Sequence, residues 1–372
     1  MATRSHTYDA AGNRIKTGGS FARSGLPPAL ATTTYNANNQ QTMFGASTET
    51  YDLNGNLATV TEAGITTTYS WNARNQLTGI SNPGFSALFT YDSFGRRTGK
   101  TILGTTINFV YDGLNPVQEK SGSTVTANLL TGLGIDEFFQ RTDGVGARAL
   151  LTDALGSTIA LGDGTGSLVT QYTYEPFGVT SETGATSTNS YKYTGREDDG
   201  SGLLYYRARY YHPRLQRFIS EDPIGFGGGS ANVYAYVSAN PLTYTDPLGL
   251  WRWPSDIFND AMNDTSASFP HSQTQHNDSA DAYRHCLASC MMTRENSEFE
   301  ARVFGWMNEK LRNIASQQER GEEHMDNNNN AIGRECGRTA QSTGDCSSGC
   351  MNALVNGRLI NSYRPGWTRP YW

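Results

Sequence analysis

The chain of 372 residues has no cysteine before position 286 and no apolar run of the roughly 18–20 residues that a membrane-spanning helix needs. Its first residues contain no apolar segment of the kind that a secretory signal peptide carries. Neither sign of charge dominates, since 29 Lys and Arg stand against 35 Asp and Glu. We therefore expect no transmembrane segment, no classical signal peptide and no extended basic surface for nucleic acid.

The composition changes sharply at residues 241–250. All five cysteines and four of the six histidines follow Leu250, whereas Gly, Thr, Ser, Tyr and Asn dominate before it. The length suffices for two domains of about 100–200 residues each. After Leu250 the sequence has 12 Lys and Arg against 15 Asp and Glu, a net charge of −3, so the second part is not basic either. This boundary predicts two domains with different functions.

A Tyr-Asp pair, or a close variant, recurs along the first part. Examples are Tyr51-Asp52, Trp71-Asn72, Tyr91-Asp92 and Tyr111-Asp112. Asp and Asn side chains bond to the backbone in turns, where Gly and Asn also tolerate positive φ, and the flanking runs alternate as strands do. One hairpin cannot bury an apolar face, but an array of hairpins can. The pattern predicts a long series of antiparallel strands.

These units resemble the YD repeats of bacterial Rhs proteins and of their relatives, the teneurins and the insecticidal toxin-complex C proteins. Further segments resemble the Rhs-associated core: residues 172–178, 193–197, 202–213, 217–225 and 246–250. The resemblance implies a mixed fold class, with an all-β YD-repeat shell segment over residues 1–250 followed by a mainly α-helical C-terminal domain. It implies repeats forming a partial β-shell over 1–170, a core with a self-cleavage site over 171–250, and a variable toxin domain over 251–372.

The same resemblance implies that Asp222 and Asp246 form a self-cleaving pair that cuts between Leu250 and Trp251, with Arg196 as a positioning cation. Two aspartates that share one proton can split a peptide bond, because one activates water and the other donates a proton. The alternative is that both Asp-Pro-x-Gly segments are ordinary turns, in which Asp caps and Gly supplies positive φ.

The residue pattern after Leu250 is typical of a helical domain. We expect helices over residues 277–293, 297–318, 319–334 and 347–359, and the second of these is strongly amphipathic. Residues 327–330 are four consecutive asparagines, which are poor helix formers because their side chains compete for the backbone. Their position indicates either a local break in the helix or a functional requirement.

Two of these helices carry polar side chains that would converge if the helices pack together. The first carries Asp281, Arg284 and His285, and the third carries Glu322, His324, Asp326, Asn329 and Asn330. His285 or His324 could act as a general base oriented by a carboxylate. Alternatively, His285, His324 and Asp326 could bind a divalent metal ion, or these residues could simply form a solvated polar face. The combination weakly resembles a group of helical toxin domains, which implies a toxin more than a particular reaction.

The cysteines form two pairs spaced four residues apart, Cys286 with Cys290 and Cys346 with Cys350, and Cys336 is left over. Two helices bearing such pairs could be joined by two disulfides, could hold zinc, or could bury four ordinary thiols. Disulfides would require an oxidising compartment, such as the periplasm of a target cell.

Taken together, the sequence predicts an Rhs-type effector that cleaves itself to release a C-terminal antibacterial toxin, most simply a hydrolase acting on lipid, nucleic acid or cell wall. This implies a cognate immunity protein and a secretion or delivery apparatus, for example of type VI. The alternatives are a membrane-active or target-binding toxin module without catalysis, and an inactive orphan Rhs fragment.

Overall fold

The structure is a computed structural model that describes residues 5–8, 14–18, 27, 29–30, 32–228, 230–250, 254–269, 279–295, 301 and 320–359. It divides into two compact units. The first comprises residues 1–132, 136–222 and 232–243, and the second comprises 133–135, 223–231 and 244–372. Among the described helices, none combines the length and apolar character needed to cross a membrane.

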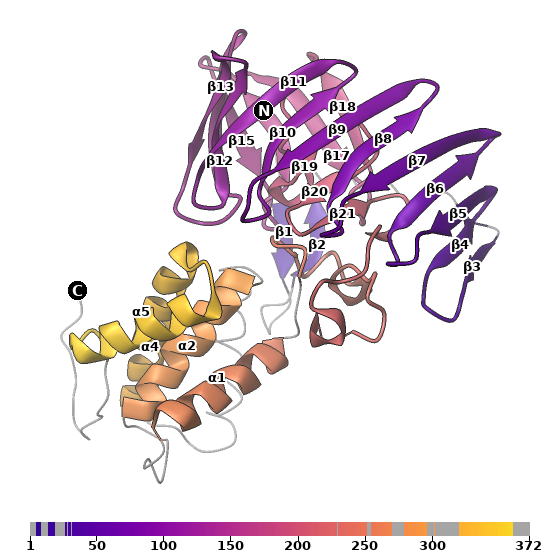
Figure 1. Ribbon diagram of the computed structural model, residues 1–372. Helices are drawn as coiled ribbons and strands as arrows, with labels where there is room; N and C mark the ends of the chain where they lie inside the picture. The colour runs from indigo at the N-terminus through magenta and orange to yellow at the C-terminus, as the bar shows by residue number, and fades with distance from the viewer. Residues whose placement is uncertain are drawn as a thin grey trace. The chain divides into compact units, whose positions relative to one another are not determined.

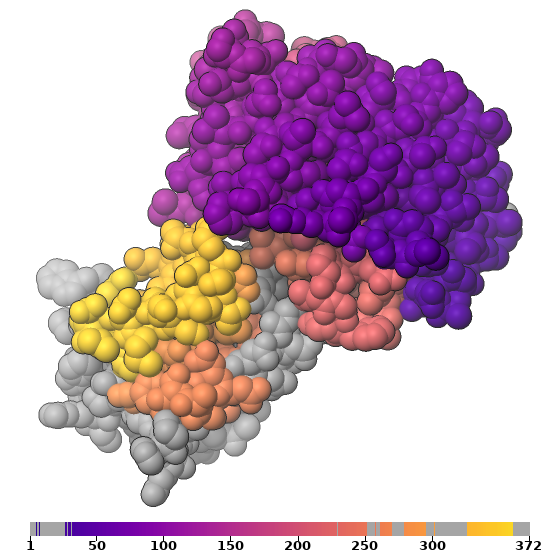
Figure 2. Space-filling model, viewed as in Figure 1, coloured from indigo at the N-terminus to yellow at the C-terminus, as the bar shows by residue number. Residues whose placement is uncertain are grey.

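The first unit is dominated by a sheet of 16 antiparallel strands in which each strand pairs with the next one along the chain (Figure 1). Its strands are β3 (Thr33–Tyr35), β4 (Gln41–Phe44), β5 (Ser47–Tyr51), β6 (Leu57–Glu62), β7 (Ile65–Trp71), β8 (Leu77–Asn82), β9 (Phe85–Tyr91), β10 (Arg97–Ile102), β11 (Thr105–Asp112), β12 (Asn115–Ser121), β13 (Thr124–Thr131), β14 (Phe138–Asp143), β15 (Gly146–Thr152), β16 (Thr158–Gly162), β17 (Leu168–Tyr174) and β18 (Thr180–Gly184). A separate hairpin joins β1 (Ser5–Tyr8) to β2 (Arg14–Gly18). In the space-filling view the N-terminal strands present one continuous, closely packed surface (Figure 2).

The repeated Asp or Asn makes the turns between strands. The Oδ1 atom of Asp92 accepts hydrogen bonds from the backbone N–H groups of Phe94 and Arg96, each at 2.9 Å. Gly95 then adopts a φ of 86°, a conformation that costs glycine little because it has no Cβ. The same side-chain bonds recur at Asp52 and Asp153. The turn chemistry predicted from the repeat is therefore what closes the hairpins.

The repeated aromatic residue ties each hairpin to an earlier one. The Tyr91 hydroxyl donates to the backbone carbonyl of Leu77 at 2.6 Å, and the Tyr111 hydroxyl donates to that of Arg97 at 2.8 Å. The indole N–H of Trp71 does the same to Leu57 at 2.8 Å. In each of these three cases the acceptor lies 14 residues before the donor, so the repeats Trp71, Tyr91 and Tyr111 make the same contact.

A second sheet of four short strands carries the core motif within the same unit. It consists of β19 (Glu197–Asp198), β20 (Leu204–Tyr206), β21 (Arg209–His212) and β22 (Arg217–Phe218). Arg97 of β10 is fully buried and forms ion pairs with Glu197 and Asp199, while its guanidinium lies 4.3 Å from the centre of the Tyr205 ring. A buried charge of this kind needs several partners, so these contacts fasten the core motif to the repeats.

The second unit contains four described α-helices, α1 (Pro254–Ser268), α2 (Ser279–Glu295), α4 (Arg320–Thr339) and α5 (Thr343–Val355), and a short 3-10 helix over Gly225–Gly228. They confirm the mixed fold class, a strand array followed by helices. No range was predicted for α1, although proline in its first position is a common start for a helix. The amphipathic segment predicted over 297–318 lies outside the described residues except for Ala301.

Candidate functional site

The proposed scissile end of the chain is organised around Asp246, within the second unit. Asp246 is fully buried, and its Oδ1 atom accepts a hydrogen bond from the backbone N–H of Leu250 at 2.9 Å. The Gly249 N–H bonds to the Asp246 carbonyl at 3.3 Å, and Gly249 adopts a φ of 70°. This is a tight turn, and it places one carboxylate beside the residue that precedes the predicted cut.

Asp222, in the first unit, pairs with Arg209 and not with Arg196, the residue expected to be the positioning cation. Its Oδ2 atom lies 2.9 Å from Nη2 of Arg209, and both side chains are buried. Arg196 instead pairs with Asp136, which also binds Arg207. Burial alone would raise the pKa of Asp136, but these two guanidinium groups outweigh it and hold the pKa below its ordinary value. Arg209, which lies in the segment 202–213 of the core motif, was not among the predicted residues.

In the second unit, α2 is a central helix whose residues from Ala280 to Thr293 are all buried. It packs against α1, α4 and α5. A helix buried on every side is normally apolar all round, and a buried polar side chain is costly unless it is paired. Even so, Asp281, Arg284, His285 and Ser289 lie along this helix.

His285 is the centre of this polar group. Its Nε2 atom lies 3.3 Å from Oδ1 of Asp326 and 3.7 Å from Oδ1 of Asp281. Its Nδ1 atom lies 3.3 Å from Oδ1 of Asn330, which also accepts a hydrogen bond from the Ser289 hydroxyl at 3.0 Å. The two aspartates and the histidine offer ligand atoms within 4.8 Å of one another, so they could hold a metal ion.

Charge on this cluster is partly balanced within α2. Arg284, one turn after Asp281, forms an ion pair with its carboxylate, and the side chains are 8 % and 1 % exposed. Asp326 in α4 is equally buried, at 1 % exposure. Ser289 was not among the predicted residues. The available signal was its position four residues after His285, since residues at that spacing share a helix face.

The asparagine run does not break α4, which is continuous through residues 327–330. Asn329 and Asn330 are buried, and Asn330 faces His285 and Ser289 of α2. Asn327 is exposed, and Asn328 donates to the Arg358 carbonyl at 3.3 Å. Of the two alternatives for this run, the local break is wrong, because packing against α2 overrides the weak helix propensity of asparagine.

Two glycines let α4 approach α2 closely. A Cβ added at Gly333 would overlap the carbonyl oxygen of Cys286, and one added at Gly337 would overlap that of Cys290. His285 near the start of α2 faces Asp326 near the start of α4, and Cys290, later in α2, faces Gly337, later in α4. The two helices therefore run parallel. The site depends on this close approach, because its groups come from both helices.

Gly333→Ala is expected to destabilise the helical unit by about 1–3 kcal/mol, because the methyl group must push the two helices apart. The matched control is Gly344→Ala in α5, where the nearest atom to an added Cβ is Ser342 Oγ at 3.5 Å. That change is expected to be neutral or stabilising, since alanine is the better helix former. Thermal unfolding of the two variants tests this, and equal transitions would contradict it.

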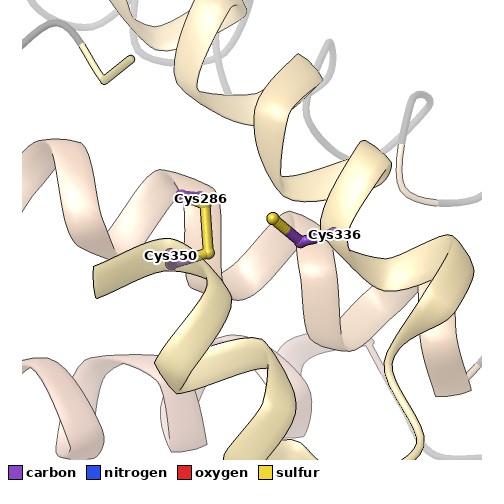
Figure 3. A group of neighbouring side chains, drawn as sticks. All are labelled: Cys286, Cys336 and Cys350. Carbon is purple, nitrogen blue, oxygen red and sulfur yellow. A yellow bond between two sulfur atoms is a disulfide. The ribbon is translucent and has the colours of Figure 1, made fainter. Parts of the chain in front are cut away.

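The described cysteines form two disulfides that join α2 to α5. Cys286 is bonded to Cys350 and Cys290 to Cys346, with Cα–Cα distances of 5.8 and 5.6 Å. Cys336 in α4 is a free, half-buried thiol directed toward the first of these disulfides (Figure 3). Burial, reinforced by Glu335, raises the pKa of the Cys336 thiol, although Arg358 opposes the rise. The thiol is therefore a poor nucleophile at neutral pH.

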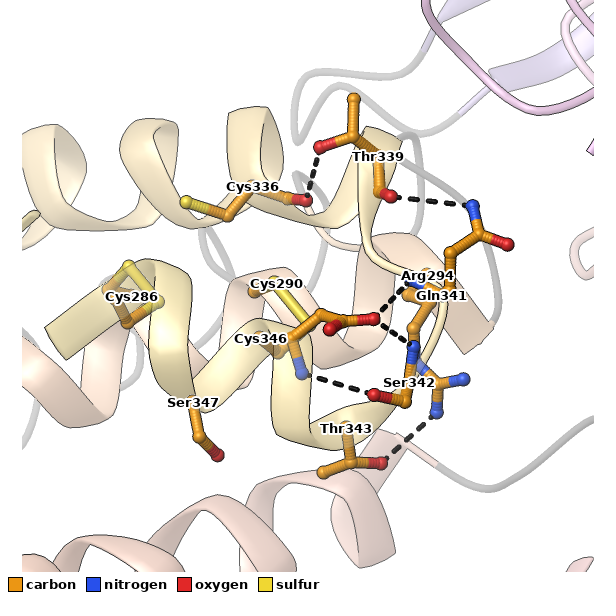
Figure 4. The surroundings of a disulfide bond; sticks show 12 residues. Cys286, Cys290, Arg294, Cys336, Thr339, Gln341, Ser342, Thr343, Cys346 and Ser347 are labelled. Carbon is orange, nitrogen blue, oxygen red and sulfur yellow. Dashed lines mark hydrogen bonds between the residues drawn. A yellow bond between two sulfur atoms is a disulfide. The ribbon is translucent and has the colours of Figure 1, made fainter. Parts of the chain in front are cut away.

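A three-residue turn, Ala340–Ser342, connects α4 to α5 and begins α5 with a capping box. The Ser342 hydroxyl accepts from the Asp345 N–H at 3.2 Å, and the Asp345 carboxylate accepts from the Ser342 N–H at 2.8 Å (Figure 4). Arg294 of α2 donates to the Thr343 hydroxyl at 3.2 Å in the same place. Because such a short turn reverses the chain, α5 runs antiparallel to α4 and hence to α2.

The remaining predicted residues of this domain are only partly described. Glu322 and His324 lie in α4, but their side chains fall outside the described residues. The described residues of the cluster are Asp281, Arg284, His285, Asp326 and Asn330, which the structure brings together. Asn329 is fully buried next to them in sequence.

Comparison with known families divides the chain where its composition changes. The sequence model of the Teneurin YD-shell family matches residues 2–228, more than half of the chain. A second model, a domain of unknown function named DUF6973, matches residues 250–359. The second match begins at the residue before the predicted cut and includes the whole polar cluster of α2 and α4.

Individual relatives match the chain over limited parts of their own length. The tRNA3(Ser)-specific nuclease WapA of Bacillus spizizenii is 31 % identical over 265 residues, covering 67 % of this chain and 11 % of the relative. The toxin subunit YenC1 of Yersinia entomophaga is 41 % identical over 101 residues, covering 26 % of this chain and 10 % of the relative. The chain thus spans about a tenth of each of these relatives.

Among solved structures, the Photorhabdus luminescens Tc holotoxin pore is similar, with 20 % identity and a TM-score of 0.47. The similarity covers 68 % of this chain and 17 % of that chain.

Proposed function

The chain belongs to the Teneurin YD-shell family, and on that premise we propose that it is the end of a shell-forming toxin whose C-terminal helical unit is a hydrolytic effector. Two relatives are named as a nuclease and as a toxin subunit, which supports a toxin role for the family part that they share. The effector would be carried by a delivery apparatus and neutralised in the producing cell by an immunity protein.

The first step of this function is self-cleavage between Leu250 and Trp251. Asp246 is hydrogen-bonded to the Leu250 N–H, so its carboxyl group lies one residue from the bond to be cut. The guanidinium of Arg209 stabilises the charge of Asp222, which suits that carboxylate to act as the base that activates water. Asp246, fully buried, would donate the proton to the leaving amine. Arg196, paired with Asp136, has a structural role in this proposal.

The second step is hydrolysis by the released helical unit, and the arrangement around His285 carries this proposal. A buried histidine with two aspartates on one nitrogen and an amide oxygen on the other is an arrangement that can activate water. Burying a histidine and two aspartates between central helices costs free energy of folding, so neither stability nor helix propensity explains why these groups are there. The nuclease name of one relative adds nucleic acid to lipid and cell wall as substrates to test.

His285→Gln is expected to abolish toxicity when the chain is directed to the periplasm of a susceptible bacterium. Loss of a group that transfers protons or holds the reacting water lowers the rate by about 10²–10⁴-fold, so growth should recover almost fully. Asp326→Asn should act in the same way. The matched control is Glu335→Gln, which changes a half-exposed carboxylate on the same helix and should remain toxic.

Far-UV circular dichroism and disulfide mapping would establish that each variant is folded. A folded His285→Gln chain that still kills would refute the hydrolase and favour a membrane-active or target-binding module. A wild-type chain that kills neither from the periplasm nor from the cytoplasm would support an inactive fragment.

A further inference from the structure

Three hydrogen-bond acceptors meet at His285: its own Nε2 atom and one carboxylate oxygen each from Asp281 and Asp326. Oδ1 of Asn330 can only accept, and it already accepts from Ser289, so the Nδ1 atom facing it must carry a hydrogen. In a neutral imidazole the other nitrogen, Nε2, then presents a lone pair. That lone pair faces carboxylate oxygens of Asp326 and Asp281, which are acceptors too. A positively charged species placed among these three groups would therefore meet three acceptors.

We propose that this species is a divalent transition-metal ion, such as Zn²⁺ or Mn²⁺, bound by Asp281, His285 and Asp326; its use in catalysis rests on the hydrolase proposed above. The other candidate is a proton on Nε2, and distance separates the two. Charge-assisted N–H···O⁻ bonds measure about 2.7–2.9 Å. Both nitrogen–oxygen separations are longer, at 3.3 and 3.7 Å. Tetrahedral ligands about 2.0–2.2 Å from one metal ion lie about 3.3–3.6 Å apart, which matches the 3.3 Å separation and lies slightly below the 3.7 Å one.

The surroundings match those of a metal site as well. A histidine that binds a metal ion usually gives its other ring N–H to an acceptor, which fixes the ring and its tautomer. Here Asn330 is that acceptor, and Ser289 holds the amide oxygen in place. Ligating carboxylates are themselves hydrogen-bonded, as Asp281 is to Arg284, which contacts the same oxygen, Oδ1, that faces His285. One imidazole and two carboxylates suit zinc or manganese better than calcium.

Three protein ligands leave a fourth position for water, which is the arrangement of a catalytic rather than a structural site. The net charge of the site favours a hydroxide ion over a water molecule at this fourth position. Arg284 and a divalent ion together exceed the two carboxylates by one positive charge, and a hydroxide ion would neutralise it. A metal ion lowers the pKa of bound water to about 7 in favourable sites, so hydroxide would be available at neutral pH.

The test is direct metal binding by the purified, oxidised full chain carrying Cys336→Ser, which removes the free thiol as a competing ligand. After stripping with EDTA, the chain is dialysed against Zn²⁺ or Mn²⁺ and the bound metal is quantified. One equivalent is expected, with affinity falling at least about 100-fold in Asp326→Asn and about 10-fold in Ser289→Ala, which acts through Asn330. Glu335→Gln should bind as the parent does.

The outcomes separate this inference from the proposed function. Binding that Asp326→Asn leaves unchanged, or no binding at all in a chain with both disulfides formed, would overturn the metal site. If metal does not bind but folded His285→Gln has lost toxicity, the hydrolase stands as a metal-free acid–base centre. If metal binds and folded His285→Gln remains toxic, the metal site stands and the hydrolase fails.

Discussion

Asp246→Asn is expected to leave the chain whole, whereas the parent chain is cut between Leu250 and Trp251. Asparagine has the same shape and its side-chain oxygen can still accept from the Leu250 N–H, so the turn should survive. What is lost is the proton that the carboxyl group donates to the leaving amine. Proton transfer by a positioned group contributes about 10²–10⁴-fold, which would turn complete cleavage into none over the same period.

The measurement is the intact mass of the purified chain over time, against 40.6 kDa for the uncut protein. Asp222→Asn should block cleavage equally, and Arg209→Met should slow it by removing the partner of the Asp222 carboxylate. Asp163→Asn is the matched control, because Asp163 makes the same kind of turn at an exposed site. A parent chain that stays whole, or one that is cut at another bond, would contradict the proposed dyad.

The second large effect concerns the disulfides of the helical unit. Cys286–Cys350 closes a loop with a sequence separation of 64, worth about 4 kcal/mol by chain entropy. Cys290–Cys346 lies inside that loop, so once the outer bond has formed the inner one closes only a short ring and adds about 2–3 kcal/mol. Against a typical domain stability of about 5–15 kcal/mol, removal of both should unfold the helices or leave them marginal at 37 °C.

Thermal unfolding followed at the helical signal would compare the parent chain, each Cys-to-Ser pair and the chain in reductant. Removing either pair alone should lower the midpoint by a similar amount, because the bond that remains still closes a loop with a sequence separation of 56 or 64, whereas removing both should lower it far more. Cys336→Ser should change it little. Toxicity should follow stability, appearing in the periplasm and weakening in a reducing cytoplasm. Identical transitions with and without reductant would show that the helices do not depend on these bonds.

The strand array was predictable because its information is local. Asp92 and Gly95 close their turn through atoms two to four residues apart, and alternation in the flanking runs is enough to assign the strands. The order of the sheet follows from the same fact, since each strand pairs with its neighbour in sequence.

The sites were less predictable because their partners come from distant parts of the chain. Arg196 lies in a recognisable motif, yet its carboxylate partner is Asp136, 60 residues earlier. The sequence left the asparagine run open between a helix break and a functional requirement, and only the packed structure shows that Asn330 faces a buried histidine 45 residues away. Periodicity placed Asp281 and His285 on one helix face, but only the packing of α4 against α2 supplies Asp326.

The short turn at Ala340–Ser342 has a consequence for oxidative folding. Four cysteines can pair in three ways, and two of those join α2 to α5. With α5 reversed by the turn, Cys286 comes opposite Cys350 and Cys290 opposite Cys346; a parallel α5 would bring together Cys286 and Cys346 instead. The short capped turn thus selects the native isomer, and lengthening it should yield scrambled species in which Cys336 competes as a fifth thiol.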